Sequence, residues 1–370
     1  MSFRINDNIK AAIYIEDMEL PLDNGNALKI LHIRAGVFDA VPVLHMEFVD
    51  TLKLVPKLNL NDGSQVEVHI EGAVKIVRNF RVYSWSRTPC GDGFEYSVDC
   101  YWDAPKYYMG TSLGGIRGTS YSALRDICQE CGLEFSALNT ETSDDMLWMP
   151  TNRAYFKFAK DIARYGYAGE KSHMVLAVDT MGVMRYRDVN ANKQPIKILT
   201  LLVDNNDPNS LAIHDFAPHG RPGIANMVGG YMHMRYGQSI IDPYADPIEK
   251  LTLDSDARFP SVNVDVRGIV DRSHVTYSPI DVGNTHYSYE QAKIQNARYS
   301  LLNSMQGEFL IGWQTMFEPC DNFNYVSPAE MNNDQYDGEY TVSTKIIFIA
   351  GANYNEKIVA VKNGLNNVGR

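Results

Sequence analysis

The stretch Gly338-Glu-Tyr-Thr-Val-Ser-Thr-Lys-Ile-Ile-Phe-Ile-Ala-Gly351 is followed closely by Asn353-Tyr-Asn-Glu-Lys-Ile-Val-Ala-Val-Lys-Asn-Gly364. In the first segment Tyr340, Val342, Thr344, Ile346 and Phe348 alternate with Glu339, Thr341, Ser343 and Lys345. This alternation is typical of a strand with one dry and one wet face. Asp337-Gly338 and Asn363-Gly364 are turn dipeptides, because Gly and Asn tolerate the positive φ of tight reversals. The stretch therefore predicts two closing strands.

Composition places the chain among water-soluble, multi-domain proteins. At 370 residues the length predicts about two or three domains. Hydrophobic residues make up 45% and charged residues 21%, enough to bury real cores. No apolar run approaches the roughly 18 residues of a membrane span. The start, Met1 to Asp7, has no apolar signal-peptide core, so we expect synthesis in the cytoplasm without export.

The formal net charge of −11 argues against a general nucleic-acid binder. Such a binder needs a basic surface to displace counterions from phosphate, and no Lys/Arg cluster is present. An acidic wall would suit a channel that passes DNA quickly, because it repels the strand. An ordinary solvated acidic surface explains the charge equally simply.

Five cysteines give little support to a disulfide framework or a metal site. Cys128 and Cys131 have ligand spacing, but no second Cys or His pair follows at usable spacing. Leu124, Ile127, Cys128 and Cys131 fall on one face of a helical pattern, where cysteine packs as a small apolar residue. We therefore expect both thiols to be buried and reduced, with no metal and no other cofactor.

Hydrophobic periodicity divides the chain into β-rich and helix-containing parts. Residues 1 to about 105 alternate as strands, with a hairpin from Phe80 to Trp102 about Gly91-Asp-Gly93. Gly110 to Gly118 is interpreted as a glycine-rich linker. A helix follows from Thr119 or Ser120 to Cys131, closed by Gly132. A second helix begins after Asn152 and ends at Gly166, before a hairpin of Met174 to Val189.

The remainder of the chain predicts strands, an irregular segment and one long helix. Strands dominate from about 175 to 280, interrupted by Pro243, Pro247 and Pro260. Tyr289 to Gln306 is the longest helical pattern, with Gly307 as its stop. The two closing strands follow Glu318-Pro319 in the sequence.

Two enzymatic readings have weaker support than a structural one. Gly110-Thr-Ser112-Leu-Gly114 matches the G-x-S-x-G nucleophile elbow, but the strand-to-helix context and the βαβ units are missing. Asp242, Asp246, Asp254 and Asp256 are candidate acids for sugar cleavage, yet their separations are unknown and solvated carboxylates are the simpler interpretation. A phage-borne serine or cell-wall hydrolase and a glycan-binding β module remain the alternatives.

The order of these motifs resembles the tail hub family of contractile-tailed bacteriophages, which includes the hub portion of type VI secretion spikes. The resemblance lies in the helix at 120–132, in Asn152 to Tyr167 leading to a hairpin with Asp179-Thr-Met-Gly182, and in the long helix. Glu308 to Pro319 and the Gly-Glu-Tyr-Thr-Val close complete it. Cys320 departs from the glycine expected after Pro319, which puts the shape of that turn in doubt.

The resemblance implies a mainly β fold with α+β inserts: two tail-tube-like β-barrel domains plus smaller helix-containing domains. On this basis we expect a first barrel at 1–110, an α-containing insert at 111–174, and a second barrel beginning at 175–250. An irregular segment with the long helix follows at 251–319, and the strands at 320–370 close the second barrel.

The resemblance also implies a structural, non-enzymatic role in the virion baseplate. The expected form is a homotrimer that adapts a six-fold tail tube to a three-fold spike, since three chains with two similar faces match six positions. Implied partners are the tail tube or tube-initiator protein, the central spike, other baseplate proteins and a tape measure protein. DNA would pass without specific binding, and no stable membrane association is implied. No catalytic, cofactor-binding or metal residue carries over.

Overall fold

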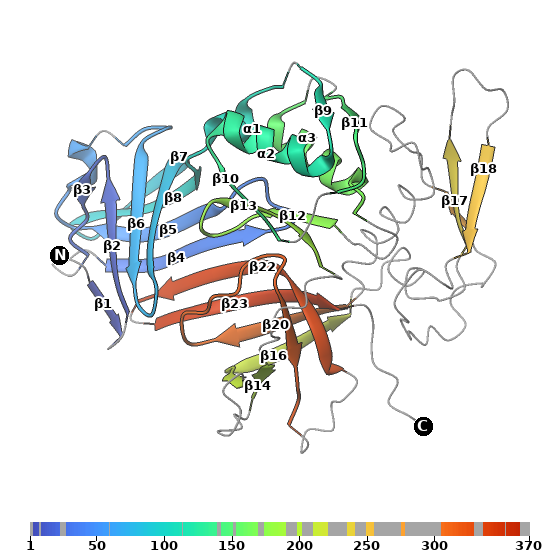
Figure 1. Ribbon diagram of the computed structural model, residues 1–370. Coiled ribbons are helices and arrows are strands. Elements are labelled where there is room, and N and C mark those ends of the chain that lie inside the picture. The colour runs from blue at the N-terminus through green and yellow to red at the C-terminus, as the bar shows by residue number, and fades with distance from the viewer. Residues whose placement is uncertain are drawn as a thin grey trace.

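The computed structural model describes residues 3–6, 9–22, 27–58, 60–112, 114–138, 142–150, 153–168, 174–189, 198–201, 210–220, 305–328, 336–351 and 353–362. It also gives the backbone of three strands, β17 (Arg235–Ile240), β18 (Glu249–Asp254) and β19 (Val275–Tyr277). These three strands pair only with one another in the part of the chain that is described. The expected mainly β fold with helical inserts is confirmed (Figure 1).

The N-terminal strands form a curled sheet that we call lobe 1. Its strands are β1 (Phe3–Asn6), β2 (Ile9–Ile15), β3 (Met18–Glu19), β4 (Ala27–Gly36), β5 (Val43–Asp50), β6 (Gln65–Glu71), β7 (Lys75–Cys90) and β8 (Gly93–Trp102), with a short 3-10 helix η1 (Val55–Lys57). They pair in the order β1-β2-β6-β7-β8-β5-β4. The alternating side chains of these strands bury one apolar face, including Ile13, Val68 and Val98, which are fully buried. The predicted hairpin of β7 and β8 is confirmed.

A second strand cluster, lobe 2, lies below lobe 1 in Figure 1. It contains β14 (Ile198–Thr200), β15 (Ser210–Ala212), β16 (Asp215–Gly220), β20 (Met305–Ile311), β21 (Asn322–Tyr325), β22 (Gly338–Ala350) and β23 (Asn353–Lys362). Its core is aromatic, built on Phe309, Phe323, Tyr325 and Tyr340. The two predicted closing strands are confirmed as β22 and β23, which pair antiparallel.

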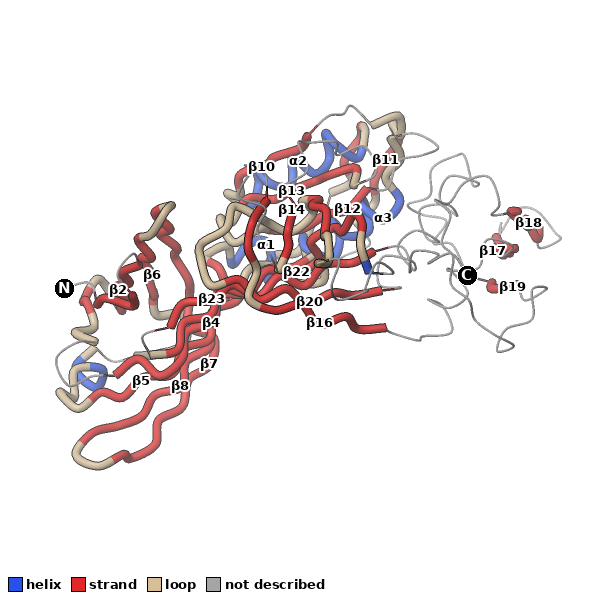
Figure 2. The backbone as a smooth tube through the Cα atoms, turned by 90° about the horizontal axis from the view of Figure 1, so that it is seen from below, coloured by secondary structure: helices blue, strands red, loops and turns tan. Residues whose placement is uncertain are grey.

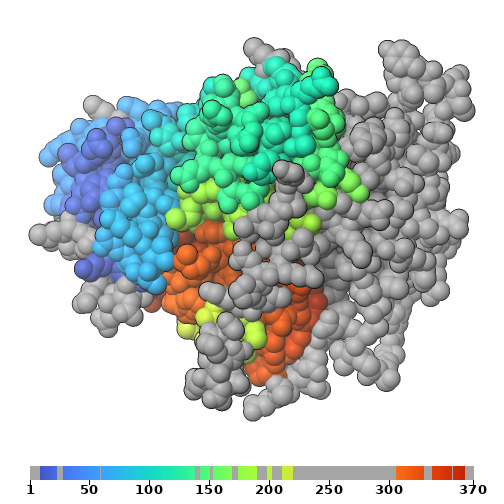
Figure 3. Space-filling model, viewed as in Figure 1, coloured from blue at the N-terminus to red at the C-terminus, as the bar shows by residue number. Residues whose placement is uncertain are grey.

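The helices form a separate α/β unit that covers one side of the place where the lobes meet (Figure 3). It contains α1 (Pro105–Met109), β9 (Ile116–Gly118), α2 (Ser120–Cys131), β10 (Glu134–Leu138), β11 (Met146–Trp148), α3 (Tyr155–Tyr165), β12 (Met174–Val178) and β13 (Val183–Asp188). The Thr119 side chain caps α2 by accepting from Ser122 N, and Gly132 ends the helix at φ +72°. Both predicted helices are confirmed.

Two sequence predictions in this region need correction. Gly110 to Gly118 is not a linker, because Thr111 bridges Ala154 and Ile116–Gly118 pairs with β11. The hairpin of β12 and β13, expected in the second barrel, pairs instead with β10 in a three-stranded sheet. One face of its strands packs against α2 and α3, and the other face contacts Val37, Cys320 and Val361, so the α/β unit extends beyond residue 174.

Strand β22 belongs to both lobes. Its first residues, Gly338–Thr341, pair with β21 in lobe 2, and Thr344–Ala350 pair with β4 in lobe 1. On the other edge it pairs with β23 from Thr341 to Ala350. The fifteen-stranded sheet is therefore continuous from one lobe to the other.

A bulge at the centre of β22 overturns the uniform alternation expected from the sequence. The register with β23 shifts between Val342 and Thr344, so the extra residue moves every later side chain to the other face. Tyr340 and Val342 are buried in lobe 2 as predicted, but Ile347 and Ile349 are buried in lobe 1, and Ile346 and Phe348 are not on the dry face. Lys345, expected in solvent, is 1% exposed.

The long predicted helix falls largely outside the described residues. Residues 289–304 are among those not described. Its last two residues, Met305 and Gln306, are not helical, because they open β20 and pair with both β16 and β23. Among the described residues no helix is long and apolar enough to cross a membrane.

The turn between β12 and β13 sets the position of the α/β unit on lobe 1. Gly182 has φ +77°, and a Cβ built on it would lie 2.1 Å from Trp102 Cζ2 of β8. We expect Gly182→Ala to lower the free energy of unfolding by about 2–4 kcal/mol, from the strained backbone and the overpacking together. Chemical denaturation measures this loss. Gly63→Ala is the control, since Gly63 has φ +87° with open space around it, and should lose only about 1–2 kcal/mol. Equal losses would contradict the contact with Trp102.

Candidate functional site

A buried ionic cluster lies where the two lobes and the α/β unit meet. Lys345 Nζ of β22 lies 3.3 Å from Glu318 Oε1 and 3.5 Å from Glu356 Oε2 of β23, and donates to the Thr315 carbonyl at 3.1 Å. The Glu356 side chain is fully buried, accepting from Thr315 N and Oγ1 and from the Tyr354 hydroxyl. The charged groups of Lys345 and Glu356 therefore both have hydrogen-bond partners, as burial of charge requires.

The loop from Glu318 to Asp321 forms a tight turn that carries one carboxylate of the cluster. Asp321 N donates to the Glu318 carbonyl at 3.0 Å, with Pro319 at the second position and Cys320 at φ +76°. These are the features of a type II turn. The turn keeps the shape that a glycine would give, although Cys320 is fully buried and holds a left-handed backbone that costs a non-glycine residue about 1–2 kcal/mol.

The Asp179–Gly182 turn of the α/β unit enters the same cluster. Glu318 Oε2 accepts from Thr180 N at 2.9 Å, and its Oε1 accepts from Thr180 Oγ1 at 2.5 Å. Arg78 of lobe 1 donates to the Thr180 carbonyl at 2.5 Å. Thr180 therefore bonds both to Glu318 and to Arg78 of lobe 1. The Asp179-Thr-Met-Gly182 turn thus links the α/β unit to lobe 1 and to the loop that carries Glu318.

A second ion pair of the cluster runs from β13 to the loop. Arg185 Nη2 donates to Asp321 Oδ1 at 2.6 Å and its Nε lies 3.9 Å from Asp179 Oδ2. Asp179 Oδ1 accepts from Met181 N and Val183 N. The Asp179 carboxylate therefore accepts from backbone groups of the turn that it begins, as Asp commonly does.

Burial and the neighbouring charges together leave the pKa values of both Lys345 and Asp179 raised. Burial alone would lower the pKa of Lys345, but Glu318 and Glu356 more than offset it, so its pKa lies above the ordinary value. Burial, reinforced by the charge of Glu318, raises the pKa of Asp179 to about 6, against the opposing backbone hydrogen bonds and Arg185. Lys345 is therefore charged at neutral pH, whereas Asp179 titrates just below it.

The raised pKa of Asp179 makes stability fall as pH rises. In the folded chain the carboxyl holds its proton up to about pH 6, but in the unfolded chain only to its ordinary value of 3.8. Between these values the folded state binds more protons, so ionisation at higher pH favours unfolding. We expect Asp179→Asn to gain stability relative to the wild type by about 2 kcal/mol between pH 4.5 and pH 7.5. Denaturation at both pH values tests this, and a constant difference between the two proteins would refute it.

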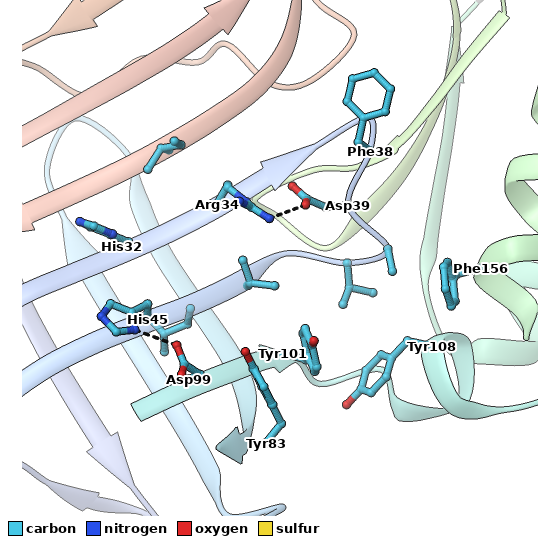
Figure 4. A pocket seen from close by; sticks show the side chains of 15 residues that line it. His32, Arg34, Phe38, Asp39, His45, Tyr83, Asp99, Tyr101, Tyr108 and Phe156 are labelled. Carbon is cyan, nitrogen blue, oxygen red and sulfur yellow. Dashed lines mark hydrogen bonds and ion pairs between the residues drawn. The ribbon is translucent and has the colours of Figure 1, made fainter. Parts of the chain in front are cut away.

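A recess of about 650 Å³ opens between the outer face of lobe 1 and the helices (Figure 4). Two side-chain pairs cross its floor: Arg34 Nη2 donates to Asp39 at 2.7 Å, and His45 Nδ1 lies 2.7 Å from Asp99. The wall toward the helices is aromatic. It includes Tyr108 of α1 and Phe156 of α3, and on the lobe 1 side Tyr83 of β7 is stacked on Tyr101 of β8 with ring centroids 4.2 Å apart.

The lining of the recess is polar and aromatic. Burial and the neighbouring His45 lower the pKa of His32, so its ring is neutral at pH 7. Burial raises the pKa of Asp39 in spite of Arg34. The two acids that line the recess are each held by a cation or an imidazole, and its hydroxyl groups are tyrosine phenols.

Ser112, Cys128 and Cys131, which the sequence offered as catalytic or metal-binding candidates, make no contact with the buried ionic cluster. Ser112 Oγ donates to the Gly114 carbonyl at 3.3 Å, and Ser112 N donates to the Arg153 carbonyl. Both hydrogen bonds of Ser112 are therefore made to backbone carbonyls. Cys128 and Cys131 are buried on the core face of α2, as predicted, and burial raises the pKa of Cys131 to about 11. Asp242, Asp246 and Asp256 lie outside the described residues, and only the backbone of Asp254 is described. Within the described ranges no group of three or more His, Cys, Asp or Glu is placed to hold a metal.

Lys345, Glu318 and Glu356 were missed at the sequence level. Lys345 stands at a position that regular alternation assigns to solvent. In the sequence, Glu356 is flanked by the polar residues Asn355 and Lys357. Only the Glu318-Pro319 dipeptide was singled out, as a turn. A lysine in a strand so rich in apolar residues is the one available hint.

Comparison with solved structures relates the whole chain to tail proteins. A tail protein from Neisseria meningitidis superposes with a TM-score of 0.63 at 10% identity, covering 97% of this chain and 98% of its own. The 43 kDa tail protein of prophage MuSo2 from Shewanella oneidensis gives 0.62 at 13% identity, with 97% of each chain covered. The E. coli c3393 protein, a type VI secretion component described as similar to bacteriophage T4 tail proteins, gives 0.50 at 9% identity over 96% and 79%.

No family model matches the sequence, and no curated protein matches it. At 7–13% identity the likeness to these and related solved structures lies in the fold. This likeness extends over nearly the whole chain and agrees with the motif order found in the sequence. The chain has the fold of phage tail proteins and of type VI secretion spike-related proteins, and its resemblance to the tail hub family is confirmed at that level.

Proposed function

We propose that this chain is the structural baseplate hub of a contractile-tailed phage. The observation that carries the proposal is the match to two phage tail proteins over 97% of this chain. The two strand lobes joined by β22 support it, because they supply two β faces per chain. The hub would act as a homotrimer that adapts a six-fold tail tube to a three-fold spike and forms part of the DNA channel. It would have no enzymatic role.

The proposed partners follow from this position in the tail. They are the tail tube or tube-initiator protein above, the central spike below, other baseplate proteins and a tape measure protein. The likeness to a type VI secretion component supports a spike partner. The net charge of −11 suits a wall that lets DNA pass without binding it. The protein would be located in the virion baseplate after assembly in the host cytoplasm, without stable membrane association.

The two lobes are the proposed tube-like barrels. Lobe 1 occupies residues 3–102, and lobe 2 is completed by residues 305–362. We expect the lobes to superpose by a rotation of about 60° about the trimer axis, because six tube positions are shared by three chains. The α/β unit would lie outside the ring, where no six-fold constraint applies.

Mass measurement and imaging test the proposal together. Light scattering of the protein with its spike and tube partners should give a hub component of about 125 kDa, three times the 41.7 kDa chain. Electron microscopy of the same sample should show a ring with a central hole. A chain that remains monomeric in the assembled tail, or a dimer, would overturn the proposal.

A further inference from the structure

The recess between lobe 1 and the helices has the size and setting of a small-molecule site. Its volume of about 650 Å³ lies within the roughly 300–1,000 Å³ of ligand pockets in proteins. Its lining comes mostly from β4, β5, β7 and β8 of lobe 1 and from α1 and α3 of the α/β unit (Figure 4). Side chains on regular elements are held more precisely than side chains on loops, so the recess is formed before any ligand arrives.

Aromatic rings are exposed along the recess. Phe38 is 58% exposed and Tyr83 is 46% exposed. Tyr83 is stacked on Tyr101, and the Tyr101 ring lies 5.3 Å from the Tyr108 ring, centroid to centroid. Single exposed apolar side chains are common on protein surfaces, but a group of them gathered at one hollow marks a binding surface.

The formal charges in the lining are already paired. Arg34 Nη2 donates to Asp39 Oδ1 at 2.7 Å. His45 lies between two carboxylates, with its Nδ1 2.7 Å from Asp99 Oδ1 and its Nε2 3.4 Å from Glu47 Oε1. A charged ligand would have to compete with one of these pairs, whereas a neutral ligand leaves both intact. The recess therefore favours a neutral ligand.

The lining keeps hydrogen-bonding capacity that these pairs do not use. Among the described residues, none donates to Asp39 Oδ2 or to Asp99 Oδ2. The phenol hydroxyls of Tyr83, Tyr101 and Tyr108 line the same recess, and a phenol can both donate and accept. A ligand rich in hydroxyl groups can use these atoms without carrying charge.

Two other ligand classes fit the recess less well. A peptide that adds to a sheet needs a free strand edge. In the floor, however, β5 pairs with β4 and β8, β4 also pairs with β22, and β8 also pairs with β7 (Figure 2). A nucleotide needs a cation for its phosphates, but the Arg34 guanidinium in the lining is held by Asp39.

We propose that the recess binds a neutral mono- or disaccharide in its pyranose form. The C–H groups on one face of a pyranose form an apolar surface that packs on an aromatic ring, here Tyr83. The hydroxyl groups around the edge of the sugar donate to Asp39 and Asp99 and accept from the tyrosine phenols. The site lies within one chain, so the inference does not depend on the trimer or on the hub role proposed above.

Saturation-transfer NMR of the full chain with defined sugars tests the inference. The probes are the methyl pyranosides of glucose, galactose, mannose, rhamnose, N-acetylglucosamine and N-acetylgalactosamine. At least one should receive saturation from the protein and bind with a Kd of about 1 mM or tighter. Transfer to none of them would overturn the inference, and so would binding of glucose 6-phosphate or an acidic peptide without binding of any neutral probe. Both results leave the hub proposal standing, because mass and imaging test it separately.

Substitutions in the lining locate the bound sugar. Tyr83→Ala removes the ring on which the sugar packs and Asp99→Asn removes a charged acceptor, so each should weaken binding at least about tenfold. Trp85→Ala is the matched control, because Trp85 is an exposed aromatic residue of the same strand that does not line the recess, and binding should be unchanged. A melting temperature close to that of the wild type shows that each variant folds. Wild-type affinity in either lining variant, or an equal loss in Trp85→Ala, would refute the inference.

Discussion

Lys345→Met is expected to lower the free energy of unfolding by about 3–5 kcal/mol at neutral pH. The side chain is 1% exposed and lies between Glu318 and Glu356. Removing the ammonium leaves a fully buried carboxylate at Glu356 without its counter-charge, and the desolvation cost of that group is then uncompensated. Urea denaturation at pH 7.5 measures the loss.

A surface lysine on the next strand is the control for this substitution. Lys357 Nζ of β23 lies 2.5 Å from Glu308 Oε2, but both side chains are partly exposed. Exposed pairs contribute about 0–1 kcal/mol, so Lys357→Met should have little effect. Adding Glu356→Gln to Lys345→Met should recover part of the stability, because it removes the orphaned charge. A loss below about 1 kcal/mol for Lys345→Met would show that the cluster does not join the parts as described.

Phe309→Ala is expected to destabilise the protein by about 3–5 kcal/mol. The Phe309 ring is fully buried at the centre of lobe 2, with ring centroids at 4.9 Å from Phe216 and Phe323 and 5.3 Å from Tyr340. Truncation removes these aromatic contacts and leaves a cavity that the sheet cannot close.

The matched control is the exposed Phe38, beside the recess. It is 58% exposed, so Phe38→Ala should change stability by no more than about 1 kcal/mol. Calorimetry of both variants compares them directly. Equal effects of the two truncations would mean that lobe 2 has no packed aromatic core.

Strand and helix positions were predictable wherever local chemistry decides them. The capping of α2 by Thr119 and Gly132 and the turn at Gly182 are set by backbone preferences that these residue types express locally. The hairpin of β7 and β8 follows from alternation about Gly91-Asp-Gly93. These elements were found correctly because their signals lie within a few residues.

Partner choice among strands was not predictable in the same way. The sequence shows that Val183–Asp188 is a strand, but not that it pairs with β10 rather than with lobe 2. Likewise one residue inserted at Ser343 carries no compositional mark, yet it reverses the faces of β22 and buries Lys345. The site was missed because long-range pairing and a single bulge place its charged groups together.

The sharing of β22 has a consequence for synthesis on the ribosome. The strands of lobe 1 are made first, and β4 can pair with β5 early, but its partner on the other edge is missing until Thr344–Ala350 has emerged, long after the α/β unit. Pairings between distant segments form slowly and leave strand edges open in the meantime. The nascent chain must therefore carry an incomplete lobe 1 sheet through most of translation. We expect its need for chaperones to end abruptly once the last two strands leave the exit tunnel.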